Sequence, residues 1–445
     1  MAGMNRPKPT DNVRQQLITG CHRFLREAVD TGARLFGSSE LPRRTFTSQV
    51  MEPSGSGNYT GKQISGSELD RTALWNQISG AMKGTDSWEQ ARTSVQQYID
   101  VHGIKPCGFW LHDVETHFLL PVVERYLVEM DSLSYRRVPA DKAIRALLRH
   151  LDSDEVEVTG LIVLEGFTSE RPFRIERKID IHPIQDAELL ALGRNEAPWN
   201  IPFALRPPLR APATDWWICE VRLPNRRGTA DGWNRIDDIR NALALALRAF
   251  KSGGVRLGLA TKQLSDTFGR TGQIFGGRFE TIARGQPSYA LSEKDIRKFV
   301  RFWHRMAAFM DEHKHFLQLP IRRLRAAGTR SEMEDALVDY VVGLEALLGT
   351  ADERTELGYR FRVRGSVLLA ERKSDRKKHV AELRELYDLR SNIVHGQDVS
   401  MAKLEQVLPI AENSLRYIWN WYFANWYDQR DNRSAISRID ELLLG

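Results

Sequence analysis

Two residues near the C-terminal end have the types and the spacing that acid–base chemistry on a phosphate ester needs. Arg390 and His395 lie in the stretch LYDLRSNIVHG at 386–396, with four residues between them. Guanidinium is a permanent, planar cation that binds phosphate oxygens, and imidazole exchanges protons near neutral pH. The pair therefore indicates phosphodiester cleavage without a metal ion. The competing interpretation is that both side chains only occupy a helix end, where the helix dipole favours cations.

Neighbouring residues favour the catalytic interpretation. Asn392 lies between Arg390 and His395 and offers both a donor and an acceptor, and Gly396 is expected to end the helix directly after His395. Glu345 occupies an apolar position of a second predicted helix. A carboxylate on such a face needs a partner, and we expect an arginine from a neighbouring helix.

Length and composition indicate a chain of two or three domains. It has 445 residues, of which 42% are hydrophobic, whereas single cores stop growing at about 250–300 residues. The longest apolar runs, such as 242–247 and 341–348, are far shorter than the roughly 20 residues that span a bilayer. No signal-peptide pattern begins the chain, and the three scattered cysteines are typical of a reducing cytoplasm. We therefore expect a cytoplasmic protein, and its net charge of +6 permits a nucleic-acid partner without requiring one.

Residues 1–150 are predicted to form a mostly helical region. Apolar residues recur at helical spacing over five segments, namely 11–36, 69–82, 88–101, 115–129 and 140–151. Ser, Gly and Thr dominate residues 37–67, which we predict to be a long loop.

Residues 151–291 are predicted to form an α+β domain, which could serve as a sensor or regulator. Alternation and β-branched residues predict strands at 156–167 and 171–181, paired as a hairpin, and further strands at 216–223 and 255–259. A helix is expected over 236–250. The glycine-rich run at 269–277 resembles a phosphate-binding loop but lacks the Gly-Lys-Ser/Thr ending, so a turn is predicted there.

Residues 292–445 are predicted to form an all-α bundle. Ser292 and Asp295 resemble a capping box at the start of the first helix. Helical spacing predicts helices at 292–317, 332–348, 355–371, 375–394 and 401–428. The predicted fold class is thus multidomain, with a helical N-terminal region, an α+β middle domain and a C-terminal helical bundle.

The bundle resembles the HEPN domain of many prokaryotic defence and toxin ribonucleases, and most closely its ApeA-like subgroup. The resemblance rests on DALVDYVVGLEALLG at 335–349 and on the Arg-x4-His element at 386–396, and it extends over 292–426. Many members carry Asn, Asp or His directly after the arginine, whereas this chain has Ser391 followed by Asn392. Either residue could be the polar helper.

The resemblance implies a metal-independent endoribonuclease without a cofactor, whose product carries a 2′,3′-cyclic phosphate. His395 would transfer protons and Arg390 would hold the phosphate, supported by Glu345, Ser391 and Asn392. Because one catalytic histidine per chain is few for this reaction, we expect the family's solution, a homodimer with two Arg-x4-His elements in one cleft. Antiphage defence or abortive infection is the expected role.

A basic stretch lies upstream of the Arg-x4-His element at 386–396. Residues 354–378 contain nine Lys or Arg and three acidic residues; the candidates for RNA contacts there are Arg360, Arg364, Lys377 and Lys378. The alternative for this stretch is a solvated surface.

The bundle could instead be a catalytically silent RNA-binding or assembly module. The protein could also be a toxin neutralised by an antitoxin, although its long upstream region argues against a bare toxin; a phage-derived trigger is a further possible partner.

Overall fold

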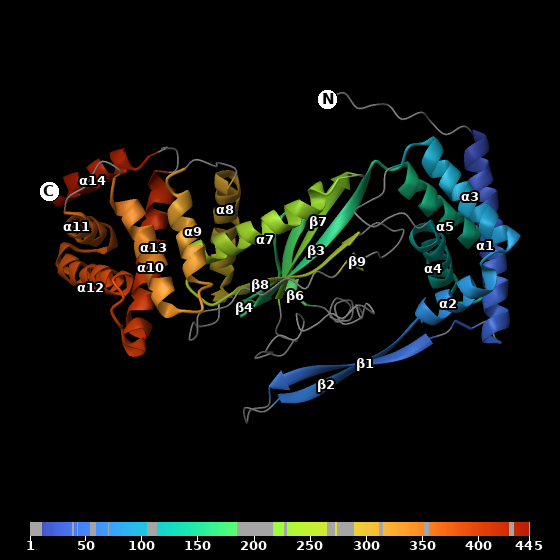
Figure 1. Cartoon of the computed structure of the whole chain (residues 1–445), viewed down its shortest axis with the longest axis horizontal. Coiled ribbons are helices and arrows are strands. Elements are labelled where there is room, and N and C mark those ends of the chain that lie inside the picture. The colour runs from blue at the N-terminus through green and yellow to red at the C-terminus, as the bar shows by residue number, and fades with distance from the viewer. Residues whose placement is uncertain are drawn as a thin grey trace.

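The computed structural model describes most of the chain. The described residues are 11–37, 40–41, 43–53, 59–69, 71–104, 114–184, 217–226, 229–264, 272–273, 289–310, 315–350, 356–426 and 431–444. Figure 1 shows the N-terminal helices at one end of the molecule, a sheet in the middle and the C-terminal helices at the other end. None of the helices in these ranges combines the length and the apolar character that crossing a membrane requires.

The N-terminal region is helical, as predicted, and has a core of its own. Its helices are α1 (Asp11–Phe36), α2 (Arg71–Met82), α3 (Asp86–Val101), the π-helix η1 (Glu115–Leu119), α4 (Leu120–Met130) and α5 (Arg137–Asp152). They bury large aromatic side chains against one another, among them Phe24, Trp88 and Tyr98. These side chains supply much of the apolar area whose burial stabilises the unit.

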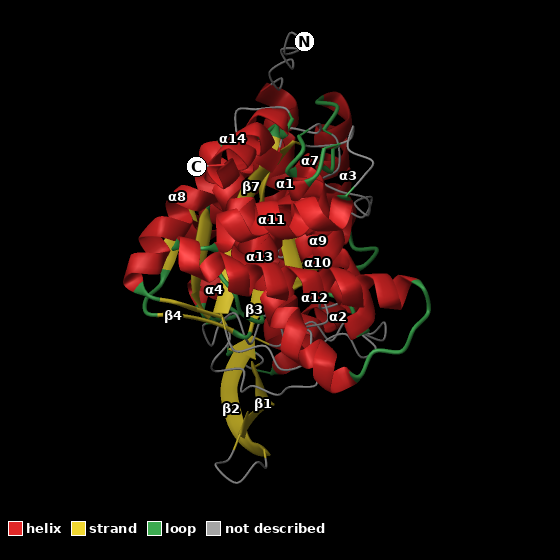
Figure 2. Cartoon of the chain, turned by 90° about the vertical axis from the view of Figure 1, so that its left-hand side faces the viewer, coloured by secondary structure: helices red, strands yellow, loops and turns green. Residues whose placement is uncertain are grey.

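Residues 37–67 are not the long loop that their composition predicts. Strand β1 (Arg43–Pro53) pairs antiparallel with β2 (Tyr59–Leu69) along the full length of both strands. The ribbon extends away from the helices in both views (Figures 1 and 2). The prediction was wrong because Ser, Thr and Gly outnumber the apolar residues, so no alternation marks the strands.

A six-stranded sheet forms the middle of the molecule. Its order is β5-β6-β7-β3-β8-β9, with strands β3 (Glu155–Glu165), β5 (Phe173–Glu176), β6 (Ile179–Pro183), β7 (Trp217–Arg226), β8 (Arg256–Leu264) and β9 (Gly272–Gln273). Beside it, β4 (Phe167–Ser169) pairs parallel with β10 (Tyr289–Leu291). Apart from the two residues of β9, the glycine-rich run at 269–277 lies outside the described residues.

The predicted hairpin between 156–167 and 171–181 is wrong. The second segment is itself a hairpin, β5–β6, and β3 lies between β7 and β8. Because the turn at 177–178 has two residues, the apolar residues of β5 and β6 keep the same alternation on both sides of it. In the sequence, the two short strands therefore resemble one long strand. Helix α7 (Asp231–Phe250) covers one face of the sheet (Figure 1). Gly160 of β3 permits this, because a Cβ there would lie 2.5 Å from Cγ2 of Ile236.

The C-terminal part is a helical bundle. Its helices are α8 (Glu293–Met310), α9 (Gln318–Ala327), α10 (Met333–Leu348), α11 (Leu357–Leu369), α12 (Arg376–Val394), α13 (Met401–Asn425) and α14 (Arg433–Leu444). The capping box is confirmed: the Asp295 N–H donates to Ser292 Oγ at 3.2 Å, and the Ser292 N–H donates to Asp295 Oδ2 at 3.4 Å. Helices α9 and α14 were not predicted, and α8 ends before residue 317.

The sheet and the bundle share one hydrophobic core that extends from β3 to α14. Polar contacts reinforce the junction at the C-terminal end of α7. Arg416 Nε of α13 donates to the Arg248 carbonyl at 2.7 Å, and Asn420 Nδ2 donates to the Ala249 carbonyl at 2.7 Å. The last carbonyls of a helix have no partner within it, so side chains of the bundle complete α7.

Candidate active site

His395 lies at the end of α12, where the sequence places it. The N–H of Gly396 donates to the Ile393 carbonyl and that of Gln397 to the Asn392 carbonyl, at 3.0 and 2.9 Å. These bonds form a Schellman motif. Gly396 has φ +74, in the left-handed region that glycine adopts without strain. The motif leaves the His395 side chain exposed to solvent.

Glu345 contacts an arginine of a neighbouring helix, as its apolar position predicts, and this arginine is Arg390. Its Nη2 lies 3.5 Å from Glu345 Oε2, and the two side chains are 28% and 30% exposed. The contact joins α12 to α10. Burial raises the pKa of Glu345, and the opposing effect of the Arg390 charge is smaller. Among the described residues, the buried Nε of Arg390 has no hydrogen-bond partner.

A cavity of ≈ 260 Å³ opens beside this ion pair, between α10, α11 and α12. It is lined by Glu345, Leu348, Gly349, Leu357, Arg360, Phe361, Tyr387 and Arg390. His395 is not part of the lining. Because five helical residues correspond to a rotation of about 500°, or 140° beyond a full turn, α12 directs Arg390 and His395 to different sides. One chain therefore does not bring the two into this cavity.

Ser391 and Asn392 lie between the two candidate catalytic residues and are half-buried. Their backbone carbonyls accept bonds from the turn after α12: Ser391 from the His395 N–H at 3.0 Å, Asn392 from the Gln397 N–H at 2.9 Å. The structure thus gives both residues a part in ending the helix.

The structure corrects the assignment of Arg364 to an RNA surface. Its side chain is 5% exposed, and it donates to both carboxylate oxygens of Asp440 on α14 at 2.8 and 2.9 Å. It also donates to the Leu348 carbonyl at 2.9 Å. Arg364 therefore joins α11 to α14 and to the end of α10. Its burial could not be foreseen from a sequence analysis that missed α14.

The other basic candidates occupy two separate places. Arg360 is half-buried and lines the cavity beside Arg390. Lys377 and Lys378 are exposed in the first turn of α12, about 20 Å along the helix from Arg390 at 1.5 Å per residue. Arg360 can therefore act together with the Arg390 site, whereas the two lysines could contact only a more distant part of a nucleic acid.

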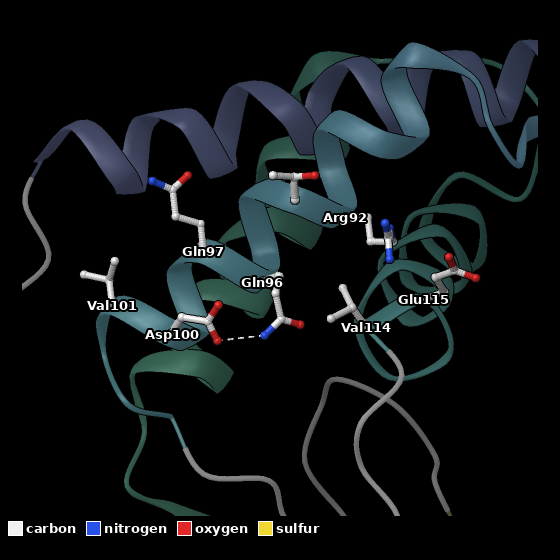
Figure 3. Close-up of a pocket in the computed structure, with 8 residues that line it drawn as sticks. Arg92, Gln96, Gln97, Asp100, Val101, Val114 and Glu115 are labelled. Atoms are coloured by element: carbon white, nitrogen blue, oxygen red, sulfur yellow. Dashed lines mark hydrogen bonds between the residues drawn. The ribbon is translucent and has the colours of Figure 1, made fainter.

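A second cavity, which the sequence analysis missed, lies in the N-terminal unit between α3 and η1 (Figure 3). Its volume is ≈ 420 Å³ and its lining is Arg92, Thr93, Gln96, Gln97, Asp100, Val101, Val114 and Glu115. Gln96 Nε2 donates to Asp100 Oδ1 across one helical turn at 2.8 Å. The residues from α3 lie on the exposed side of an amphipathic helix, and such residues carry no sequence signal for a site.

No group of three or more metal-ligating side chains occurs among the residues that the structure describes. The groups that could take part in chemistry at this site are the Arg390–Glu345 pair, the aromatic wall of the cavity and the exposed imidazole of His395.

The raised pKa of Glu345 predicts how Glu345→Gln changes stability. A carboxyl group with a raised folded-state pKa contributes stability that is present below its unfolded pKa and lost as the pH rises through the folded value. As the pH increases from roughly 4.3, wild type should therefore lose stability relative to Glu345→Gln, measured by urea unfolding at several pH values. Glu385→Gln is the matched control, since Glu385 pairs with Lys403 away from the cavity. If wild type instead gains stability over the variant as the pH rises, the ion pair with Arg390 stabilises the charged carboxylate more than burial destabilises it.

No model of a protein family, no curated protein and no solved structure matches the chain. Its function is therefore inferred from the chemistry of the site.

Proposed function

We propose that the protein is a metal-independent endoribonuclease of HEPN type. The observation that carries the proposal is the contact between Glu345 on α10 and Arg390 on α12. It joins the two sequence stretches on which the HEPN resemblance rests, and it orients a guanidinium five residues before an exposed histidine. A role in antiphage defence is part of the same proposal, with the upstream residues as regulators.

The proposed chemistry uses a guanidinium and an imidazole, the groups that Arg390 and His395 supply. In RNA the 2′-hydroxyl attacks the adjacent phosphorus, so a bond from O2′ to phosphorus forms and the bond to O5′ breaks. The products are a 2′,3′-cyclic phosphate and a 5′-hydroxyl. Arg390 stabilises the charge on the phosphate oxygens in the transition state. His395 accepts the 2′-hydroxyl proton or donates a proton to O5′.

A homodimer supplies what one chain lacks. Each chain contributes one Arg390–His395 element, and within a chain His395 does not line the cavity of Arg390. A second copy would add its own histidine to the cleft and so provide both an acid and a base. Two apolar side chains close to His395 in the sequence could take part in such a contact: Val394 is 55% exposed and Met401 is 54% exposed. Such side chains can be covered by a partner surface.

An assay of the purified full-length protein with RNA tests the proposal. We expect cleavage that is unchanged by EDTA and that yields 2′,3′-cyclic phosphate ends. RNA binding without cleavage would instead identify a silent binding module, and a requirement for a divalent metal would refute the mechanism. Co-purification of a second protein that suppresses cleavage would identify the toxin–antitoxin alternative.

A further inference from the structure

The cavity beside Arg390 has an aromatic wall and a charged wall. Phe361 of α11 and Tyr387 of α12 form part of the aromatic wall, and their ring centroids lie 5.6 Å apart. Gly358 helps to define the position of the Tyr387 ring, because a Cβ on this glycine would lie only 3.1 Å from Cε1 of the tyrosine. Glu345 and Arg390 belong to the charged wall. A flat ring with polar edges fits such a combination.

The dimensions of the cavity also point to a single ring system. Its volume of ≈ 260 Å³ is below the roughly 300–1,000 Å³ of pockets that hold drug-sized ligands. Nucleobases released from a strand stack on aromatic side chains and are identified by hydrogen bonds to their Watson–Crick edges. The cavity therefore has the size and the kind of wall that one nucleobase needs.

The Glu345 carboxylate distinguishes among the four bases. A carboxylate only accepts hydrogen bonds and can accept two side by side. Guanine presents two adjacent donors, N1–H and the 2-amino group. Adenine and cytosine present one donor beside a ring-nitrogen acceptor, and uracil presents one N–H between two carbonyls. Only guanine can satisfy both oxygens without placing an acceptor against a carboxylate.

Arg390 can connect this base site to the phosphate. Its Nη2 faces Glu345, whereas no hydrogen bond of its Nη1 occurs within the described residues. A guanidinium presents five N–H donors in a fixed fork. One arginine can therefore hold the carboxylate in position and still donate to a phosphate oxygen of the same strand.

We infer that this cavity is a guanine subsite, so that the substrate is RNA with a guanine at a fixed position relative to the cleaved bond. The inference rests on the proposed function for the substrate class, but the preference for guanine can be measured without cleavage.

Calorimetric titration of the full-length protein with the four ribonucleoside 3′-monophosphates tests the inference. We expect GMP to bind at least about tenfold more tightly than AMP, CMP or UMP, as two charge-assisted hydrogen bonds allow. Glu345→Gln should abolish that ratio, whereas the matched variant Glu385→Gln should keep it. Tyr387→Leu should weaken GMP binding by about tenfold through loss of stacking. Equal affinities for the four nucleotides, or an unchanged ratio in Glu345→Gln, would overturn the inference.

Mapping the cut sites in a random RNA pool separates this inference from the proposed function. Enrichment of guanine at one position, lost in Glu345→Gln, supports the subsite. Cleavage without any base preference overturns the subsite and leaves the ribonuclease intact. Selective GMP binding by a protein that does not cut RNA supports the subsite and refutes the ribonuclease.

Discussion

Replacing His395 with alanine is expected to slow RNA cleavage by about 10²–10⁴-fold, because it removes the group that transfers protons. The side chain is exposed, and the bond from the His395 N–H to the Ser391 carbonyl involves only backbone atoms. The free energy of unfolding should therefore change by no more than about 0.5 kcal/mol. Initial cleavage rates and thermal unfolding of both proteins measure the two expectations.

His304→Ala is the matched control for this experiment, since His304 is an exposed histidine on α8. It should cut RNA at the wild-type rate. A folded His395→Ala protein that also cuts at the wild-type rate would remove His395 from the mechanism.

Arg390→Lys is expected to lower the cleavage rate by about 10²–10³-fold, the usual effect of removing one donor that stabilises a transition-state oxyanion. Lysine keeps the charge but cannot donate two parallel hydrogen bonds to a phosphate. Single-turnover rates at saturating RNA isolate the chemical step, and the loss should appear there more than in the affinity for RNA.

Arg384→Lys provides the comparison on the same helix, because Arg384 is exposed and pairs with Asp388 at 3.5 Å. Its rate should equal that of wild type. If Arg390→Lys retains the full rate, a point charge is sufficient and bidentate phosphate binding is wrong.

The features that the sequence predicted are those with a local physical cause. Gly396 directly follows His395 and ends α12, and Ser292 and Asp295 cap α8. The contact of Glu345 with Arg390 followed from a carboxylate on an apolar helix face. The first two features depend on residues a few positions apart, where helix geometry determines which groups meet. For the third, the local signal indicated only that Glu345 needs a cationic partner, and that partner, Arg390, lies on another helix.

Features that depend on distant parts of the chain were missed. The position of β3 between β7 and β8 depends on strands far along the sequence, and the burial of Arg364 depends on Asp440 of α14. The aromatic wall around Tyr387 arises only when α10, α11 and α12 pack together. Hydrophobic periodicity identifies an element and its buried side but not its neighbours.

The core shared by the sheet and the bundle determines which fragments of the protein can survive digestion by a protease. Cutting at residue 292 would remove α7 and leave Arg416 and Asn420 without the carbonyls that they bind. It would also separate Trp303 Nε1 from Glu176 Oε1, which lie 2.6 Å apart. The segment between α5 and β3, in contrast, joins two separate cores. Limited proteolysis should therefore separate the N-terminal helices from a part in which the sheet and the bundle stay together, and the bundle alone should not persist.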